Sequence, residues 1–304
     1  MHGGADVRIT MNSIYSGITN DLSRLTGAMA RTNASISSGK IYSRPSDNPV
    51  ALTHALNVRT ALSDTEQYSH NIVYAQGWVR ATEVAMIQIS DRMTRAKELA
   101  VQGANDSLNA GDRRAIAAEI ETILEEVVAL GNSSLGGRYL FGGSRTSDYA
   151  PDEAPFILDR DGNVTYHGNG DGISVSTGSG IHLEINLNGN DSLVQSGVFE
   201  TLDLLHDSLM ADSQSDIEVA IGDIDRAFQY ITQQVAELGA RGNTLENNAD
   251  MQTQFELTSR ERLSDIEDTD LIEAAAELKI QETSYQAALA SASKVMGMSL
   301  VDFL

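Results

Sequence analysis

Apolar residues recur at alternating steps of four and three near both ends of the chain, which is the spacing of a coiled-coil seam. These two terminal stripes consist of Ile18, Leu22, Leu25, Met29, Thr32 and Ile36, and of Leu278, Tyr285, Leu289, Ala292, Met296 and Phe303. Both segments are short and rich in Ser, Thr, Asn and Ala, and isolated helices of this length are marginal in water. Each stripe therefore needs a partner helix, from the same chain or from another one.

Three longer stripes with the same spacing predict rod-like helices in the middle of the chain. They consist of Ile72, Ala75, Val79, Thr82, Met86, Ile89, Met93, Ala96 and Ala100, of Ile116, Ile120, Ile123, Val127 and Leu130, and of Ile217, Ile221, Ile224, Phe228, Ile231, Val235 and Leu238. Because three such helices can cover one another, we expect these stripes to be buried within one subunit. If the two long halves run antiparallel, both termini emerge at the same end.

Glycine, proline and polar residues mark the expected ends of the helices. Gly39 is a plausible helix stop, and Pro49 is well placed to open the next helix. Asp112 can cap the helix that carries the second long stripe. The polar stretch 239–248 is expected to separate the third long stripe from the final helix.

The segment 136–198 differs from the rest because it is rich in glycine and contains short runs of alternating polarity. This pattern predicts a small β-rich insertion. The Asp-Gly sequence within 159–163 is expected to form the turn of a hairpin between strands at 156–158 and 164–166.

The predicted fold is mainly α: an elongated antiparallel helical rod, like a coiled-coil bundle, with a small β-rich insertion domain and terminal helices that pair on assembly. The expected segments are a start extension (1–7), an N-terminal assembly helix (8–45), the first half of the rod (46–135), the β-rich insertion (136–198), the second half of the rod (199–264) and a C-terminal assembly helix (265–304).

Composition narrows the range of partners. The net charge of −22 repels phosphate backbones and anionic lipid heads, so we expect neither nucleic acid nor a membrane as a partner. No apolar run approaches the ~20 residues that a membrane span needs. The chain has no cysteine, which excludes disulfides and thiolate metal sites.

Motifs for catalysis or cofactor binding are missing, so we expect no enzyme, no metal and no cofactor. The segment 159–163 resembles a calcium loop superficially, but its glycine is misplaced and the bidentate glutamate is absent. The glycines of 168–172 lack the Lys-Ser/Thr of a phosphate loop, and neither a His-Glu-x-x-His pair nor a Gly-x-Ser-x-Gly elbow occurs. The acidic cluster 261–270 suits a solvated face or a subunit contact to basic groups such as Arg44 or Arg92 equally well.

Several segments resemble the flagellin superfamily of bacteria. The segments 37–41, 98–102 and 264–270 are similar to sequences that its members share. The run Gly-Arg-Tyr-Leu-Phe-Gly-Gly at 137–143 and the close of the chain at 285–304 look like the members that join hook and filament, where filament flagellins differ.

This resemblance implies an axial structural protein that is secreted unfolded through the flagellar export channel and resides in the flagellum. It further implies a short ring of subunits on hook-associated protein 1, flagellin as the distal partner, and a cytoplasmic export chaperone at the C-terminal helix. The nearest alternative is a filament flagellin. A secreted helical effector or adhesin is a more distant one, as is an enzyme carried in the insertion.

The terminal stripes are the expected assembly interface. Full burial of an apolar side chain stabilises by about 1.5–3 kcal/mol, so half-burial in a lone pair of helices barely offsets the ordering cost. We therefore expect neighbouring subunits to complete the burial of Ile18, Leu22, Leu25, Met29, Ile36, Leu278, Tyr285, Leu289, Ala292, Met296 and Phe303.

Overall fold

The computed structural model describes residues 11–301 except 43, 45, 151–152 and 161, and it describes side chains from 15 to 294 with the same gaps. The chain divides into two compact units. We call residues 1–63 and 256–304 the terminal unit, and residues 64–255 the central unit. The extension expected at 1–7 lies outside the described residues.

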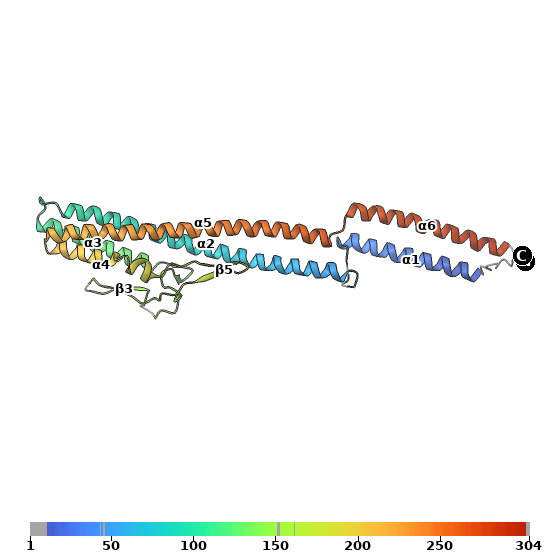
Figure 1. Ribbon diagram of the computed structural model, residues 1–304, viewed down its shortest axis with the longest axis horizontal. Helices are drawn as coiled ribbons and strands as arrows, with labels where there is room; N and C mark the ends of the chain where they lie inside the picture. The colour runs from blue at the N-terminus through green and yellow to red at the C-terminus, as the bar shows by residue number, and fades with distance from the viewer. Residues whose placement is uncertain (1–10, 43, 45, 151–152, 161, 302–304) are drawn as a thin grey trace, which may run out of the picture. The chain divides into compact units, whose positions relative to one another are not determined.

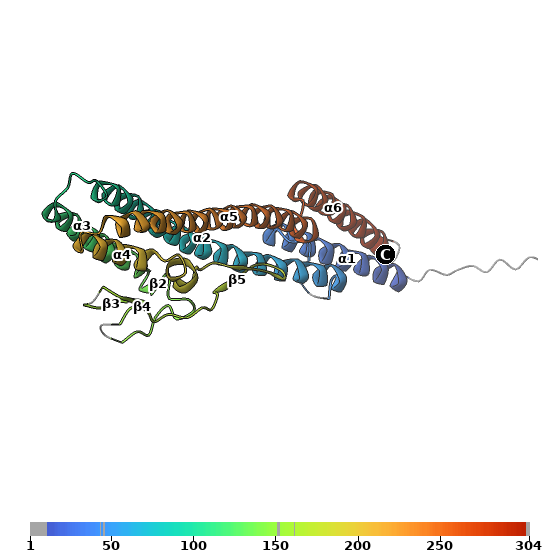
Figure 2. The same ribbon diagram turned by 60° about the vertical axis from the view of Figure 1, so that its left-hand side comes forward.

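Two helices make up most of the terminal unit. Helix α1 (Met11–Ser38) and helix α6 (Leu271–Val301) lie side by side and antiparallel (Figures 1 and 2). The first turn of α1 and the last turn of α6 therefore lie at the same end of the pair, as predicted. Helix α1 ends at Ser38, and Gly39 follows with a φ of +70°, the left-handed conformation that terminates many helices, so the predicted stop is confirmed.

Two helices are especially long: α2 (Pro49–Gly103) and α5 (Gln214–Glu267). Pro49 opens α2 as predicted, and Asn48 Oδ1 accepts a hydrogen bond from the Ala51 amide at 3.0 Å. The predicted break at 239–248 is wrong, because α5 is continuous there. A glycine costs a helix about 1 kcal/mol, and the fully buried Leu238 and Leu245 on either side outweigh that cost.

The described part of the central unit also contains two shorter α-helices, α3 (Ala110–Gly131) and α4 (Val198–Met210). Asn109, not Asp112, is the N-cap of α3. The Asn109 side chain accepts from the amide of Asp112, whose carboxylate accepts in turn from the amide of Asn109. The prediction was therefore three residues late, because Asp112 is the second member of a capping box.

The core of the central unit consists of the three long stripes that the sequence predicts. Every member of the first stripe, from Ile72 to Ala100, is at most 2% exposed. In the other two stripes every residue is buried or packed against the core. Burial of these stripes within one chain is confirmed, and Met86 and Met93 fill the core, as Met commonly does.

Among its described residues, the β-rich insertion together with the two residues that precede it forms three separate antiparallel pairs of strands. The predicted hairpin is confirmed, with Phe156 opposite Tyr166 and Leu158 opposite Val164. The strands are β1 (Ser134–Leu135) with β2 (Arg138–Tyr139), β3 (Phe156–Leu158) with β4 (Val164–Tyr166), and β5 (Ser174–Gly178) with β6 (Ile181–Glu184). A π-helical turn, η1 (Asn190–Val194), precedes α4.

Aromatic packing joins the insertion to the helices of the central unit. The Phe156 ring lies 5.0 Å from that of Tyr166 and 5.2 Å from that of Phe199 on α4. Phe156 also exchanges backbone hydrogen bonds with the Asn132 side chain, just after α3. In the described part of the chain, no helix combines the length and apolarity needed to cross a membrane.

Candidate assembly interface

The first terminal stripe faces α6 but remains incompletely covered. All six of its members are half-buried and none is fully buried. Helix α1 packs against α6, and Thr32 of this stripe accepts a hydrogen bond from Gln281 of α6 at 3.1 Å. Pairing of the terminal helices within one chain therefore removes only part of the apolar surface of this stripe from water. The six members are Ile18, Leu22, Leu25, Met29, Thr32 and Ile36.

The second terminal stripe agrees only in part with the seam of α6. Leu278 and Tyr285 are half-buried and Ala292 is 8% exposed. Leu289 is 43% exposed within a single chain, whereas its neighbour Ala288 is half-buried, so the predicted role of Leu289 in assembly stays a prediction. The side chains of Met296 and Phe303 lie outside the described residues.

Helix α6 also exposes apolar side chains outside the predicted stripe. Leu271 is 54% exposed, Ile272 84% and Ile280 66%. At 100° per residue, Ile272 and Ile280 lie far from the seam that faces α1. These residues do not follow the heptad spacing, so the heptad pattern does not predict their exposure. Helix α6 is thus apolar on several faces, of which α1 covers one.

Polar contacts close the end of the α1–α6 pair where both helices connect to the rest of the chain. The Ile41 amide donates to Glu267 O at 2.7 Å, and the Thr269 amide donates to Gly39 O at 2.9 Å. Lys40 Nζ lies 2.6 Å from Asp268 Oδ1 and 3.2 Å from Glu267 Oε2. We call these contacts between residues 39–41 and 267–269 the clamp.

Charge strengthens the clamp. Glu267 is 8% exposed and pairs with Arg59 Nη2 at 2.7 Å as well as with Lys40. The hydrogen bond from Lys40, followed by one from Ser264, lowers the pKa of Asp268, and the bond to Asp268 raises the pKa of Lys40. These shifts show that both groups are more stable in their charged forms.

The acidic cluster at 261–270 therefore has partners within its own chain. Two of its carboxylates, Glu267 and Asp268, pair with Lys40 and Arg59. Arg92 was a suggested partner, but it pairs with Glu126 at 2.9 Å. For Arg44, the other suggested partner, the described residues include no ion pair.

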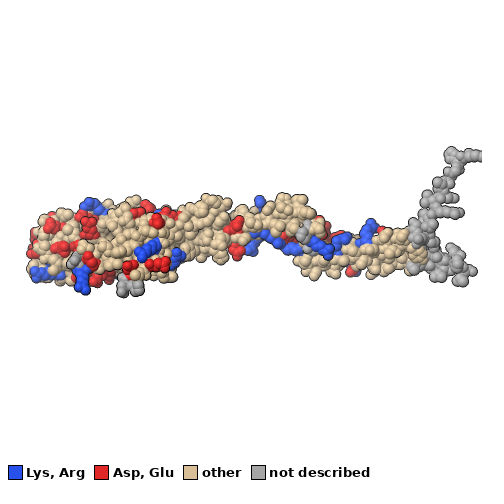
Figure 3. Space-filling model, turned by 90° about the horizontal axis from the view of Figure 1, so that it is seen from below, with Lys and Arg blue, Asp and Glu red and all other residues tan. Residues whose placement is uncertain are grey.

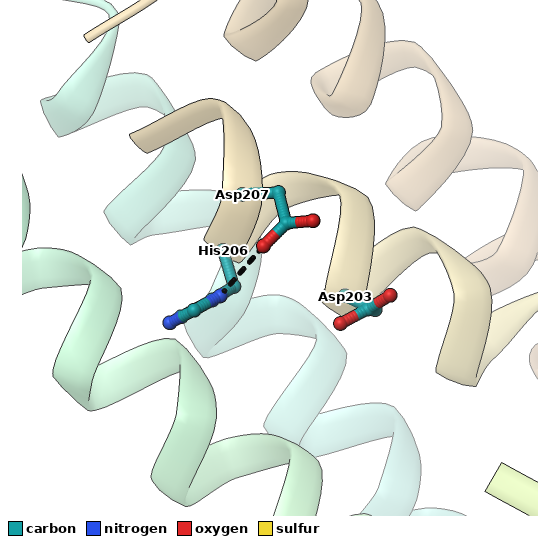
Figure 4. Close-up of side chains that lie close together, drawn as sticks. All are labelled: Asp203, His206 and Asp207. Carbon is teal, nitrogen blue, oxygen red and sulfur yellow. Dashed lines mark hydrogen bonds and ion pairs between the residues drawn. The ribbon is translucent and has the colours of Figure 1, made fainter. Parts of the chain in front are cut away.

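One group of side chains has the composition of a metal site. Asp203, His206 and Asp207 lie on α4 with ligand atoms within 4.8 Å of one another (Figure 4). His206 Nδ1 is already 3.1 Å from Asp207 Oδ1, and the Asp207 side chain is 73% exposed. Burial, and the nearby Asp207 carboxylate, raise the pKa of Asp203, so this carboxyl binds a proton more readily than usual. An ordinary surface hydrogen bond between His206 and Asp207 accounts for this geometry.

Comparison with known proteins places the chain in a family. The model of the bacterial flagellin N-terminal helical region matches residues 9–146, and that of the C-terminal helical region matches residues 221–304. Together the two models cover well over half of the chain. The chain therefore belongs to the bacterial flagellin family.

Its relatives within that family include hook-associated proteins. The chain is 26% identical to flagellar hook-associated protein 3 of Escherichia coli (strain K12), over 87% of this chain and 89% of that one. It is 25% identical to the protein of the same name from Salmonella typhimurium (strain LT2), over 97% and 98%. These matches confirm the resemblance to the members that join hook and filament. The relatives are structural proteins of the flagellum.

A solved structure has the same fold. The putative flagellar hook-associated protein of Vibrio parahaemolyticus superposes with a TM-score of 0.65 over 73% of this chain and 100% of that one. Sequence identity is 22%, so this likeness concerns the fold. The prediction of a mainly helical fold with long helices and small antiparallel sheets is confirmed.

Proposed function

We propose that this chain is an axial protein of the flagellum that forms the junction between hook-associated protein 1 and the flagellin filament. Family membership and the named relatives support a structural role in the flagellum. The observation that carries the proposal is the apolar surface of α6 that α1 leaves uncovered, including Ile272, Ile280 and Leu289.

The energetics favour further partners for this helix. A helix that is apolar on several faces is stable in water only when other elements cover those faces. Each large side chain gains about 1.5–3 kcal/mol on full burial, and Ile272 and Ile280 obtain little of it within one chain. Copies of the chain packed in a ring would supply that cover, and their terminal helices would form the common contact.

The exposed apolar surface of α6 also bears on how the chain is exported. A chain destined for the hook–filament junction is secreted through the flagellar export channel, and its folding is completed on arrival. Before export, a cytoplasmic chaperone bound to the C-terminal helix would shield the exposed leucines and isoleucines. Assembly would then exchange the chaperone for neighbouring subunits.

The test is deletion of the gene followed by complementation. Loss of swimming with hooks intact, together with flagellin leaking into the medium, is the result that this proposal expects. The variant with Ile280→Asp and Leu289→Asp should fail to restore swimming although it is exported, because both changes place charge on exposed apolar faces of α6.

A matched control carries Gln88→Asp and Gln233→Asp, which add the same charge at exposed positions of the central unit. This control should restore swimming. Normal junctions formed by the α6 variant would contradict the proposal. The alternative role of filament flagellin would instead be supported if the purified chain formed long polymers by itself.

A further inference from the structure

Charge is distributed unevenly between the two segments of the terminal unit. Residues 1–63 contain six Arg or Lys and three Asp or Glu, although the whole chain has a net charge of −22. Residues 256–304 contain four Arg or Lys and ten Asp or Glu. Two copies of so acidic a chain repel each other overall, so a local basic region bears directly on how copies meet.

The basic residues surround a hollow at the end of α1. It has a volume of about 580 Å³, and its lining includes the cations Arg31, Lys40 and Arg44, the apolar Ile41 and one carboxylate, Asp47. Ile41 is 46% exposed between these cations. Figure 3 shows Lys and Arg gathered near the connection between α1 and α2. We call this feature the basic hollow.

Two of its cations are available to a partner. Arg31 and Arg44 are exposed, and within the described part of the chain neither forms an ion pair. Lys40 differs because the clamp already holds it against Glu267 and Asp268. The hollow therefore presents two cations that lack an ion-pair partner among the described residues, together with the carboxylate of Asp47, which accepts from the Arg44 amide, and an exposed isoleucine.

The first turns of α6 have the complementary character. Glu273 and Glu277 are four residues apart, so they project from the same side of the helix. Both are exposed, and among the described residues neither pairs with a cation. Ile272 and Ile280 lie next to them along the helix and are 84% and 66% exposed. Acidic and apolar groups thus alternate here, as basic and apolar groups do in the hollow.

Pairing within one copy is the simplest alternative. A second hollow of about 440 Å³ is lined by Arg31, Glu273 and Glu277 together, so these residues face the same space. Within the part of the chain that the structure describes, no ion pair joins these residues. Exchanging charges between two different chains can restore ion pairs between copies but not ion pairs within one copy. An experiment can therefore distinguish the two kinds of pairing.

We propose that the basic hollow binds the acidic first turns of α6 of a second copy of this chain. This inference rests on the proposed function, because it names the contact that would set the register between neighbouring subunits. Each exposed ion pair is worth only about 0–1 kcal/mol. Repetition around a ring adds these small terms, and complementary charge guides the correct orientation more than it increases affinity.

The test uses two charge-reversed variants in a strain that lacks the wild-type chain. The first carries Arg31→Glu and Arg44→Glu, so that both its hollow and its α6 are acidic. The second carries Glu273→Lys and Glu277→Lys, so that both are basic. Each variant alone should be exported but absent from isolated hooks, with loss of swimming, because like charges then meet at every contact.

Co-expression of the two variants should restore both the junction and swimming. The acidic hollow of the first variant then meets the basic α6 of the second, and the basic hollow of the second meets the acidic α6 of the first. Ion pairs within a copy cannot be restored by mixing. A chain with all four substitutions should assemble alone, which shows that the substituted residues remain compatible with folding.

Two results would overturn the inference: normal assembly by either variant alone, or no rescue by the mixture. A control with Arg80→Glu and Arg114→Glu reverses two exposed cations of the central unit and should swim normally. Failure of the proposed function would be seen separately: deletion of the wild-type chain would leave swimming unchanged. Circular dichroism of each purified variant verifies that its helices form.

Discussion

Gly143 shows how a single residue secures the β-rich insertion. Its φ is +71°, and a Cβ at this position would lie 2.1 Å from the carbonyl oxygen of Asn169. The nearby Asn169 side chain accepts from the amide of Ser144 at 2.8 Å. Any side chain at position 143 therefore strains the backbone and also displaces the loop around Asn169.

Gly143→Ala should consequently destabilise the central unit by roughly 2 kcal/mol or more. Gly136→Ala is the matched control, because Gly136 also has a positive φ of +57° but has no atom within 4 Å of the added Cβ. Gly136→Ala should lower the free energy of unfolding by only about 1 kcal/mol, from backbone strain alone. Urea unfolding followed by tryptophan fluorescence measures both, and equal losses would refute the steric account.

The clamp makes a second prediction at this scale, because its charges titrate. The pKa of Asp268 is lowered from its usual 3.8, so its contribution is complete above that value and is lost as pH falls through the lower folded pKa. The pKa of Lys40 is raised from 10.5, so its contribution is complete below 10.5 and is lost as pH rises through the higher folded pKa. Both charges should therefore stabilise the clamp fully between pH 3.8 and pH 10.5.

Lys40→Met tests this pairing directly. Without the ammonium group, the pKa of Asp268 should move back up towards 3.8, which carboxyl NMR of the full chain can measure. Ser264→Ala should give a smaller change in the same direction, because its hydrogen bond is the lesser cause of the shift. An unchanged pKa of Asp268 in Lys40→Met would contradict the assignment.

At the scale of elements, the two kinds of helix differ in how well they are covered. The long stripes of the central unit are buried within the chain, whereas the stripe of α1 is only half-buried. Elements with little buried apolar surface open at lower free energy than the core. The single tryptophan, Trp78, is fully buried in the central unit and so reports on that unit alone.

Heating should therefore separate two transitions in the free chain. Circular dichroism should lose part of its helical signal first, as α1 and α6 melt, while the fluorescence of Trp78 remains unchanged. A later transition should appear in both signals. Deletion of residues 271–304 should remove the first transition and leave the second in place. Coincident transitions in the full chain would show that the terminal pair is as stable as the core.

Elements whose periodicity matches their burial could be predicted from the sequence. The stripe from Ile72 to Ala100 and the pairing of β3 with β4 belong to this group. The predicted interruption at 239–248 is wrong because the polarity of that stretch does not reveal the burial of Leu238 and Leu245. The exposed Ile272 and Ile280 were missed because a heptad search retains only residues on one seam.

At the scale of the whole chain, the clamp joins residues that are 228 positions apart, and local patterns do not reveal that contact. The sequence predicted that the terminal segments act together, and their resemblance to flagellar proteins supplied the assembly. The structure adds that α1 covers only one face of α6. The assembly interface formed by the terminal stripes remains a prediction, because a single chain contains no neighbouring subunit.

Amide hydrogen exchange of α1 and α6 tests the central claim most directly, since exchange reports how well each helix is held. It should be measured in the purified chain and in junctions on isolated hooks. We predict rapid exchange in both helices of the free chain, slow exchange in the assembled junction, and little difference along the buried stripe of α2. Equally slow exchange of α1 and α6 in both states would contradict the account, because the terminal pair would then be complete without neighbours.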